Sequence, residues 1–376
     1  MKATIIRLFS GKGSGRLTTY TPSVVVGEIC VQWASCISSR DTEKAKELKE
    51  KLDELLPTME QDDKIIAYVQ LLNFRYDMLT EVAQKQDYVV PEFADIPVDS
   101  LLQFYKFYFV GQYEFYYGRY KSAISLYNKA EAQLAHVHDE NEKAEFYHHV
   151  GMSYYRIDQY THATSYLEKA IHIFEGNPAY EERLINSKMG LGGIATDLHQ
   201  YENGEKYYLE AVNHASNYPV TKALAFRALG LSKMKQQDFE KAKSYFIKAL
   251  AIPEHQNSIF GMKSKANLAN ILYRLCDPNA QEIYEQAYGK ANQFGNMEYI
   301  IRLDLTYYLY DTYNENLLDK KLNELIDLKL NYVASSIAEE ISYFAKEKGD
   351  LKTALKFMTT AYEKRIDHQM LGGEQT

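Results

Sequence analysis

The sequence predicts an all-α fold, in which an N-terminal three-helix bundle precedes a right-handed superhelix of about seven tetratricopeptide-type repeats. Residues 24–85 contain three segments whose apolar residues recur every three or four positions, as they do on one face of a helix. From Leu101 onward, a pattern of small and aromatic residues recurs about every 40 positions, which is typical of stacked helix pairs. These two observations together predict the fold class.

The first part of the chain divides into a tail, a bundle and a linker. Residues 1–22 are expected to form a flexible tail, and residues 23–85 the bundle. Asp41 or Thr42 is positioned to cap the second helix, and the third helix follows an acidic turn. The segment 86–100 contains two of the eight prolines and is expected to be a linker. The repeats then occupy residues 101–370.

The stretch from Gly230 to Ala249 defines the repeat. It predicts two antiparallel helices joined by a tight turn near Gln237 and Asp238, with Gly230 where the two helices approach closely. The aromatic residue nine positions on, Phe239, is expected to fill the gap beside it. Three earlier units share the spacing of a small residue, an aromatic residue and two further small residues: Gly111–Tyr120–Ala123–Ala130, Gly151–Tyr160–Ala163–Ala170 and Gly192–Tyr201–Gly204–Ala211. Later units are weaker, and the sixth is poor.

Composition narrows the class of partner. The net charge of -8 argues against broad binding of nucleic acid or of an anionic membrane. No apolar run approaches the roughly 20 residues of a membrane span. The three cysteines, Cys30, Cys36 and Cys276, suit a reducing cytoplasm and are interpreted as small buried hydrophobic residues. A cytoplasmic protein is therefore expected.

Common catalytic motifs do not occur in the sequence. The histidine pairs His136/His138 and His148/His149 have no Cys or acidic partner at ligand spacing, so no metal and no cofactor is expected. The inner faces of helical repeats bind extended peptides through polar side chains. Asp197, Asn267 and Asn270 are candidates for that role on the inner helices, as is Asn186.

Three segments resemble the Rap family, the response-regulator aspartate phosphatases and quorum-sensing peptide receptors of Gram-positive bacteria. The predicted order of bundle, linker and repeats is similar as well, over roughly residues 23–370. The segments, with the family patterns that they resemble, are LPTMEQDD at 56–63 with LLNFR at 71–75 (M-E-E-D-Q-D…L-x-E-F-R), GQYEF at 111–115 (G-M-Y-E-F), and NEKAEF at 141–146 (I-E-K-A-E-F).

This resemblance implies two binding sites. A response regulator would bind the bundle and the early repeats, and a short signalling peptide would bind the inner repeat face. The regulator-binding residues would be Asp62, Asp63, Ile66, Asp139 and Glu142. The peptide-binding residues would be Asp197, which matches a family aspartate that pairs with a basic peptide side chain, together with Arg227, Ala228, Asn267 and Asn270.

Two positions depart from the family pattern. The glutamine that orients the attacking water falls on Asp63, whose carboxylate cannot donate a hydrogen bond and would repel a phosphoryl group. Asp63 could still act as a general base. Gln61 would lie about 200° around a helix from Asp63 and could not simply replace it. In the peptide site, the backbone-anchoring asparagine falls on Ala228, and Arg227 could compensate by reaching a peptide carboxylate.

Three functions remain open at this point. Sequestration of a response regulator is favoured because of Asp63, with aspartyl-phosphate phosphatase activity as the alternative. A peptide-regulated transcription factor would place the bundle on DNA. Residues 24–85 contain 8 Lys or Arg against 12 Asp or Glu, a net charge of -4, which argues against that role.

Overall fold

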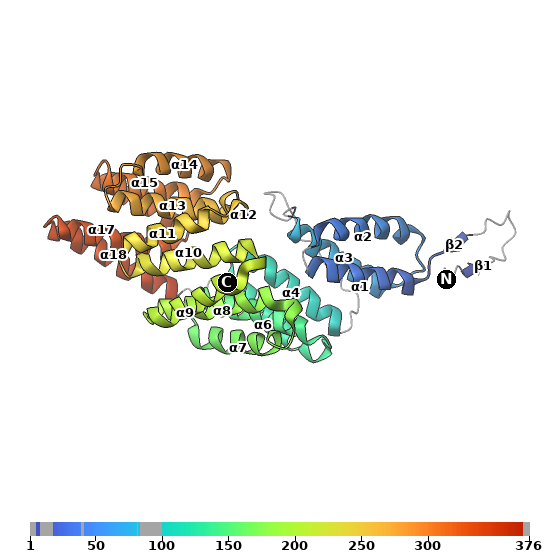
Figure 1. The fold of residues 1–376 in the computed structure, drawn as a ribbon. Coiled ribbons are helices and arrows are strands. Elements are labelled where there is room, and N and C mark those ends of the chain that lie inside the picture. The colour runs from blue at the N-terminus through green and yellow to red at the C-terminus, as the bar shows by residue number, and fades with distance from the viewer. Residues whose placement is uncertain (1–4, 8–17, 39–40, 81, 83–99, 371–376) are drawn as a thin grey trace. The chain divides into compact units, whose positions relative to one another are not determined.

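The structure is a computed structural model that describes residues 5–7, 18–38, 41–80, 82 and 100–370 (Figure 1). The prediction of an all-α fold is confirmed, since a three-helix bundle precedes a tetratricopeptide superhelix. The predicted linker, 86–100, lies outside the described residues except for Ser100, where α4 begins. The residue boundaries proposed for the domains remain predictions.

The bundle consists of α1 (Ser23–Ser38), α2 (Thr42–Leu55), a 3-10 turn η1 (Leu56–Thr58) and α3 (Asp63–Leu79). Trp33 lies at the centre of its core with no exposed surface, and Cys30 and Cys36 are buried in the same core. The N-cap of α2 is Asp41, whose side chain accepts a hydrogen bond from the backbone N–H of Lys44 at 3.1 Å. The periodic apolar residues of the sequence therefore form one shared core.

The segment before α1 contains two short strands where the sequence predicts a tail. Strand β1 (Ile5–Arg7) pairs antiparallel with β2 (Thr18–Tyr20). Thr21 then pairs with the end of η1 and the residues that follow it, because its N–H donates to the carbonyl of Thr58 at 2.7 Å and its carbonyl accepts from the N–H of Glu60 at 2.9 Å. The end of the predicted tail is thus joined to the bundle.

Seven helix pairs follow among the described residues. From α4 to α15, the first helices of successive pairs begin 38 to 41 residues apart, which exceeds the usual 34-residue tetratricopeptide unit, whereas α15 and α17 begin 34 residues apart. The pairs are α4 (Ser100–Tyr116) with α5 (Tyr120–Glu131), α6 (Glu140–Tyr155) with α7 (Tyr160–Phe174), α8 (Glu181–Asp197) with α9 (Tyr201–His214), α10 (Pro219–Lys235) with α11 (Phe239–Leu250), α13 (Ile259–Arg274) with α14 (Ala280–Gln293), α15 (Met297–Tyr310) with α16 (Glu315–Asp327), and α17 (Asn331–Glu347) with α18 (Leu351–Met370). The short elements between pairs are η3 (Leu134–His136), η4 (Pro178–Tyr180), η5 (Ala215–Asn217) and α12 (Pro253–Gln256).

The glycines of the repeat pattern mark close helix approaches, as predicted, but their neighbours differ from the expectation. A Cβ added at Gly230 would lie 2.9 Å from the ring of Phe246, and one at Gly111 would lie 2.4 Å from the ring of Tyr127. Each of these rings comes two helical turns after the aromatic residue that the sequence pattern suggested. The earlier aromatic begins the second helix, whereas the later one faces the glycine across the pair.

The turns within the pairs explain why one cysteine is not buried. Asp158, His199, Gln237 and Cys276 have positive φ angles at the turns that follow α6, α8, α10 and α13. This is the left-handed conformation that commonly ends a helix. Cys276 is exposed at its turn, so the prediction that all three cysteines are buried is wrong for this residue.

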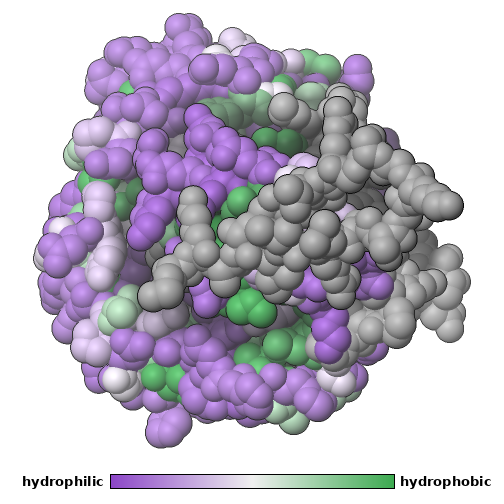
Figure 2. All heavy atoms as spheres, turned by 90° about the vertical axis from the view of Figure 1, so that its right-hand side faces the viewer, coloured by the Kyte–Doolittle hydropathy of each residue, from purple (hydrophilic) through white to green (hydrophobic). Residues whose placement is uncertain are grey.

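By compactness the chain divides into residues Met1–Lys143 and Ala144–Thr376. The first helix pair therefore groups with the bundle. Hydrophilic residues cover most of the visible face in Figure 2 outside the grey atoms, and hydrophobic residues form small patches there. None of the described helices combines the length and the apolar character needed to cross a membrane.

Candidate functional site

The start of α3 holds the predicted regulator-binding residues of the bundle. The side chain of Asp62 caps the helix by accepting hydrogen bonds from the backbone N–H groups of Lys64 at 3.1 Å and Ile65 at 3.3 Å. Asp63 is the first residue of α3, and its side chain is exposed. Carboxylates are favoured here by the positive end of the helix dipole. Asp62 therefore has a structural role, whereas Asp63 is presented to solvent.

A hollow of about 430 Å³ lies beside these residues, between the end of α2 and the first turns of α3. Ile66, the third residue of the bundle predicted to bind a regulator, lines it. The lining combines apolar side chains with three amides: Leu56, Met59, Ile66 and Val69 with Gln61, Gln70 and Asn73. A surface of this kind suits a protein partner, because it offers an apolar anchor with polar groups around it.

Gln61 does not lie on a helix, which changes the argument made from the sequence. Helix α3 begins at Asp63, and Gln61 precedes its N-cap in a segment of irregular backbone. The separation of about 200° around a helix therefore does not apply to it. Gln61 places an amide in the hollow beside Ile66, two residues from Asp63.

Asp139 and Glu142 lie at the start of α6 in different surroundings. Asp139 is exposed and accepts a hydrogen bond from the backbone N–H of Asn141 at 2.8 Å. Glu142 is half-buried and accepts a 2.8 Å hydrogen bond from the hydroxyl of Tyr105 in α4. Burial and the charge of Glu142 raise the pKa of the Tyr105 hydroxyl well above its ordinary value. Asp139 is thus accessible to a partner, while Glu142 is bonded within the protein.

The inner face of the repeats is defined by contacts between first helices. The amide of Asn270 in α13 donates to Glu340 in α17 at 2.9 Å and to Thr306 in α15 at 3.1 Å. A side chain can reach a helix two pairs away only where the first helices converge, which is the concave side of a superhelix. Asn270 therefore lies on the inner face, as predicted.

Asp197 is already paired on this face. Its carboxylate forms an ion pair with Lys235 of α10 and accepts a hydrogen bond from Tyr155 of α6. Burial alone would lower the pKa of Lys235, but the interactions with Tyr332 and Asp197 outweigh burial and raise this pKa above its ordinary value. Sequence reasoning missed Lys235, although a signal was available. Asp197 and Lys235 each stand four residues before the aromatic that begins the second helix of their pair, so they occupy equivalent positions in neighbouring repeats.

Further along the inner face, Glu340 contacts several polar side chains. It accepts hydrogen bonds from Asn270 and Tyr310, both at 2.9 Å, and pairs with Arg274 at 2.5 Å. Burial alone would raise the pKa of this carboxyl, but the charge of Arg274 and the hydrogen bonds outweigh it and lower the pKa of Glu340. Since Asn270 holds Glu340 and Thr306, its amide is engaged within the protein.

The remaining predicted peptide-site residues lie on α10 and α13. Arg227 is hydrogen-bonded to Tyr299 of α15, and its buried Nε has no hydrogen-bond partner. Asn267 is 4% exposed; its side-chain oxygen accepts from Arg302 at 3.4 Å, and its nitrogen has no partner. Ala228 is half-buried and has no polar group to offer. The structure thus brings Arg227 and Asn267 together around α15.

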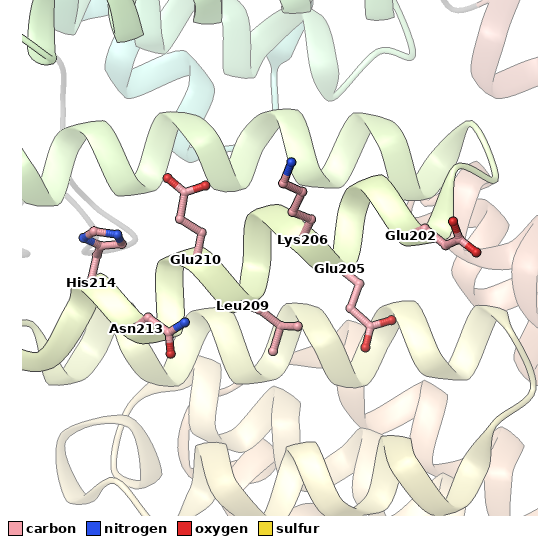
Figure 3. Close-up of a pocket in the computed structure, with 7 residues that line it drawn as sticks. All are labelled: Glu202, Glu205, Lys206, Leu209, Glu210, Asn213 and His214. Carbon is pink, nitrogen blue, oxygen red and sulfur yellow. The ribbon is translucent and has the colours of Figure 1, made fainter.

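A second hollow, of about 520 Å³, lies along α9 and forms no comparable site. Figure 3 shows that its lining side chains project from one helix, with Glu205 and Glu210 pointing to opposite sides. Glu205 pairs with Lys233 at 2.6 Å and Glu210 pairs with Lys188 at 2.9 Å. These carboxylates hold α9 to its neighbours.

His148, one of the histidines considered as a metal ligand, is a packing residue. Its ring forms a 2.9 Å hydrogen bond with Ser187 of α8. Burial and the charge of Arg183 lower the pKa of His148 to about 3, so the ring is neutral at physiological pH. Across the described residues, no three His, Cys, Asp or Glu side chains are grouped so that they could hold a metal ion.

Comparison with known proteins is consistent with this architecture. Residues 21–81 match the family model described as response regulator aspartate phosphatase H, N terminal, and residues 144–176 and 228–255 match a tetratricopeptide-repeat model. The type II methyltransferase M.CeqI of Rhodococcus hoagii is 39% identical over 360 residues, which make up 93% of this chain and 69% of that protein. Regulatory protein RapG of Bacillus subtilis (strain 168) is 28% identical over 282 residues, covering 74% of this chain and 77% of RapG.

A solved structure shares the fold over almost the whole chain. A Rap protein complexed with competence and sporulation factor superposes with a TM-score of 0.84 at 24% identity, covering 93% of this chain and 99% of that one. The matched bundle model, the matched repeats and the Rap relatives agree with the observed order of bundle and repeats. The chain belongs to the Rap family and is a Rap-type regulator.

Proposed function

We propose that this protein is a cytoplasmic regulator that binds a bacterial response regulator at the bundle and a short signalling peptide on the inner repeat face. The observation that supports the proposal is the polar inner face of the repeats, on which the carboxylate of Asp197 pairs with Lys235. In this proposal the bundle carries the regulator site and the repeats carry the peptide site. The proposed partners are proteins and peptides, not nucleic acid or membrane.

Peptide binding at Asp197 would be an exchange. Lys235 occupies the carboxylate in the structure, so a basic peptide side chain would take the place of Lys235. Asp197→Ala should abolish binding of an arginine-containing peptide, whereas Lys235→Met should strengthen it by removing the internal competitor. Calorimetric titration of both variants with the same peptide tests this. Equal binding by the Asp197→Ala variant would remove Asp197 from the site.

Regulator binding is supported by the hollow beside Ile66 and by the exposed carboxylates of Asp63 and Asp139. Asp62 would contribute by fixing the start of α3, and Glu142 by holding α6 to Tyr105. The net charge of -4 over residues 24–85 favours a protein partner over DNA. Binding of a response regulator that weakens on Ile66→Asp, with the fold retained, supports this surface.

Sequestration is the favoured mode of action. Asp63 brings negative charge, and no hydrogen-bond donor, to the position where the family carries the water-orienting glutamine. Phosphate release from a panel of phosphorylated receiver domains tests this, with the unmodified protein and Asp63→Gln side by side. We expect no acceleration by the unmodified protein and an acceleration of about 100-fold by the variant. Acceleration by the unmodified protein would make it a phosphatase, in which Asp63 or the nearby amide of Gln61 has a catalytic role.

Methyl transfer is not proposed, although one relative bears the name of a methyltransferase. The glycines at 190, 192 and 193 lie inside α8, where added Cβ atoms would meet Leu167, Tyr208 and Tyr155 within about 3 Å. They therefore permit helix packing and do not form a phosphate-binding turn between a strand and a helix. The only sheet within the described residues has two strands.

A further inference from the structure

On the inner face, cationic side chains outnumber carboxylates around Tyr299 of α15. Three cationic side chains surround Tyr299 of α15. The ammonium of Lys263 lies 5.4 Å from the ring centroid, the guanidinium carbon of Arg302 lies 4.5 Å from it, and Arg227 is hydrogen-bonded to Tyr299. Among the described residues, the ion pair of this cluster joins Arg302 to Glu298 at 3.1 Å.

Two other cations of the inner face have carboxylate partners. Lys235 pairs with Asp197, and Arg274 pairs with Glu340. Neither Arg227 nor Lys263 has an ion-pair partner among the described residues. Removing a cation from water without a counter-charge is costly, so the cluster around Tyr299 favours an anion from outside the chain.

The unsatisfied hydrogen-bonding atoms of the cluster point to the same conclusion. The Nε of Arg227 and the side-chain nitrogen of Asn267 are buried donors without acceptors. Asn267 is 4% exposed, and Arg302 holds its oxygen, which leaves the amide nitrogen to face an acceptor. A carboxylate is an acceptor with four lone-pair sites and forms strong hydrogen bonds with guanidinium groups.

We propose that Arg227, Asn267, Tyr299 and Arg302 form a carboxylate-binding subsite for the C-terminal carboxylate or an acidic side chain of the bound peptide. The inference rests on the proposed peptide-receptor function and names the second polar group that the peptide carries. This subsite would replace the peptide anchor that an alanine at 228 cannot provide, because Arg227 adjoins Ala228 on α10.

The geometry of α10 also sets the spacing within the peptide. From Arg227 to Lys235 the helix advances about 12 Å, at 1.5 Å per residue. An extended peptide advances about 3.3 Å per residue, so this distance spans about four residues. A basic side chain on Asp197 and a carboxylate at Arg227 would therefore belong to positions about four residues apart.

Three pools of N-acetylated pentapeptides provide the test. All carry Arg at position 1 and a random mixture at positions 2–4 without Asp, Glu or Cys. The first pool ends in Ala with a free carboxylate, the second in Asp with a C-terminal amide, and the third in Ala with a C-terminal amide and so has no carboxylate. Retention of each pool by the full chain is measured by affinity selection and mass spectrometry.

We expect the first or the second pool to be retained about 10- to 100-fold more than the third, and the better pool identifies the source of the carboxylate. Arg227→Gln should remove this preference, Arg227→Lys should keep part of it, and Arg119→Gln, at an exposed arginine of the first pair, should leave it unchanged. Circular dichroism melting of each variant reports its fold.

Two results would overturn the inference in different ways. If the unmodified protein retains all three pools equally and Asp197→Asn loses that retention, the peptide-receptor function is supported and the carboxylate subsite is contradicted. A carboxylate preference that persists in Arg227→Gln would also contradict the subsite. Retention of none of the pools by the unmodified protein would count against the peptide-receptor function itself.

Discussion

The two candidate sites differ in how their polar groups are used before any partner arrives. At the start of α3, Asp63 is exposed and the adjoining hollow is open, so a partner would add contacts to a surface that is already stable. On the inner repeat face, Asp197 and Glu340 already hold partners of their own, so a ligand must exchange with them. Substitutions should therefore affect mainly binding at the first site, but both folding and binding at the second.

The largest effect that sharpens this contrast is expected at Glu340. Glu340→Ala removes the counter-charge of Arg274 and the acceptor of Asn270 and Tyr310, which should lower the free energy of unfolding by about 3–5 kcal/mol. Urea denaturation measures it. Asp53→Ala, which breaks the exposed Lys49–Asp53 pair in the bundle, should cost about 0.5 kcal/mol or less. Similar losses for both variants would show that the Glu340 contacts contribute no more to stability than an exposed ion pair.

Helix approach in the repeats provides the next test. Gly230→Ala places a Cβ 2.9 Å from the Phe246 ring and should cost about 1–3 kcal/mol. Gly289→Ala is the matched control, because an added Cβ in α14 meets nothing within 4 Å and should stabilise the helix by about 0.5–1 kcal/mol. Thermal and urea denaturation of both variants should give shifts of opposite sign. A stabilised Gly230→Ala variant would show that the pair can separate freely.

Acid should weaken the repeats through their buried histidines. Burial and Arg183 lower the pKa of His148 to about 3, and burial and Arg227 lower that of His255 to about 4. Below the ordinary value of about 6.5, the unfolded chain takes up protons that the folded chain does not, so stability is present above that pH and is lost as pH falls toward the folded pKa. Each histidine should contribute up to about 1.4 kcal/mol per pH unit in this window. His148→Gln should flatten the dependence of the urea midpoint on pH between 6 and 4, whereas His136→Gln at an exposed position should not.

The smallest effect is expected at the bundle site. Asp62→Ala removes the cap of α3 and should cost about 1 kcal/mol. Asp63→Ala should change stability by less, since only its favourable interaction with the helix dipole is lost. Denaturation of both variants, together with their affinity for a response regulator, separates the two roles. Loss of affinity in Asp62→Ala alone would assign the regulator contact to the cap and not to Asp63.

Local pattern predicted the fold well but predicted the contacts between helices poorly. The bundle core and the close approaches at Gly230 and Gly111 follow from helical spacing, which is a local property. The ring that meets each glycine was misassigned because it depends on the angle between two helices. Cys276 is exposed because it lies in a left-handed turn, and a cysteine in the sequence gives no indication of that conformation.

The candidate sites were predicted residue by residue, without their partners. Asp197 and Arg227 were named from the sequence, yet the Lys235 that occupies Asp197 and the Tyr299 that holds Arg227 lie on other repeats. The pairing of Asn270 with Glu340 joins residues 70 positions apart. Such contacts depend on the curvature of the whole array, which no single repeat encodes. The irregular backbone at Gln61 was missed because the separation of about 200° treated Gln61 and Asp63 as parts of one helix, whereas α3 begins at Asp63.

The link from Asn270 to Glu340 has a consequence for how the array comes apart. In a simple solenoid each repeat touches only its neighbours, so the stability approximates a sum of repeat and interface contributions and the ends can fray independently. Here α13 is tied to α17 across α15, and His368 of α18 lies 3.5 Å from Asp158 beyond α6. The C-terminal pairs are thereby fastened to earlier ones. Fraying from the C-terminal end must first break these inner-face contacts. Loosening of the last pair therefore changes the inner repeat face, where the peptide would bind.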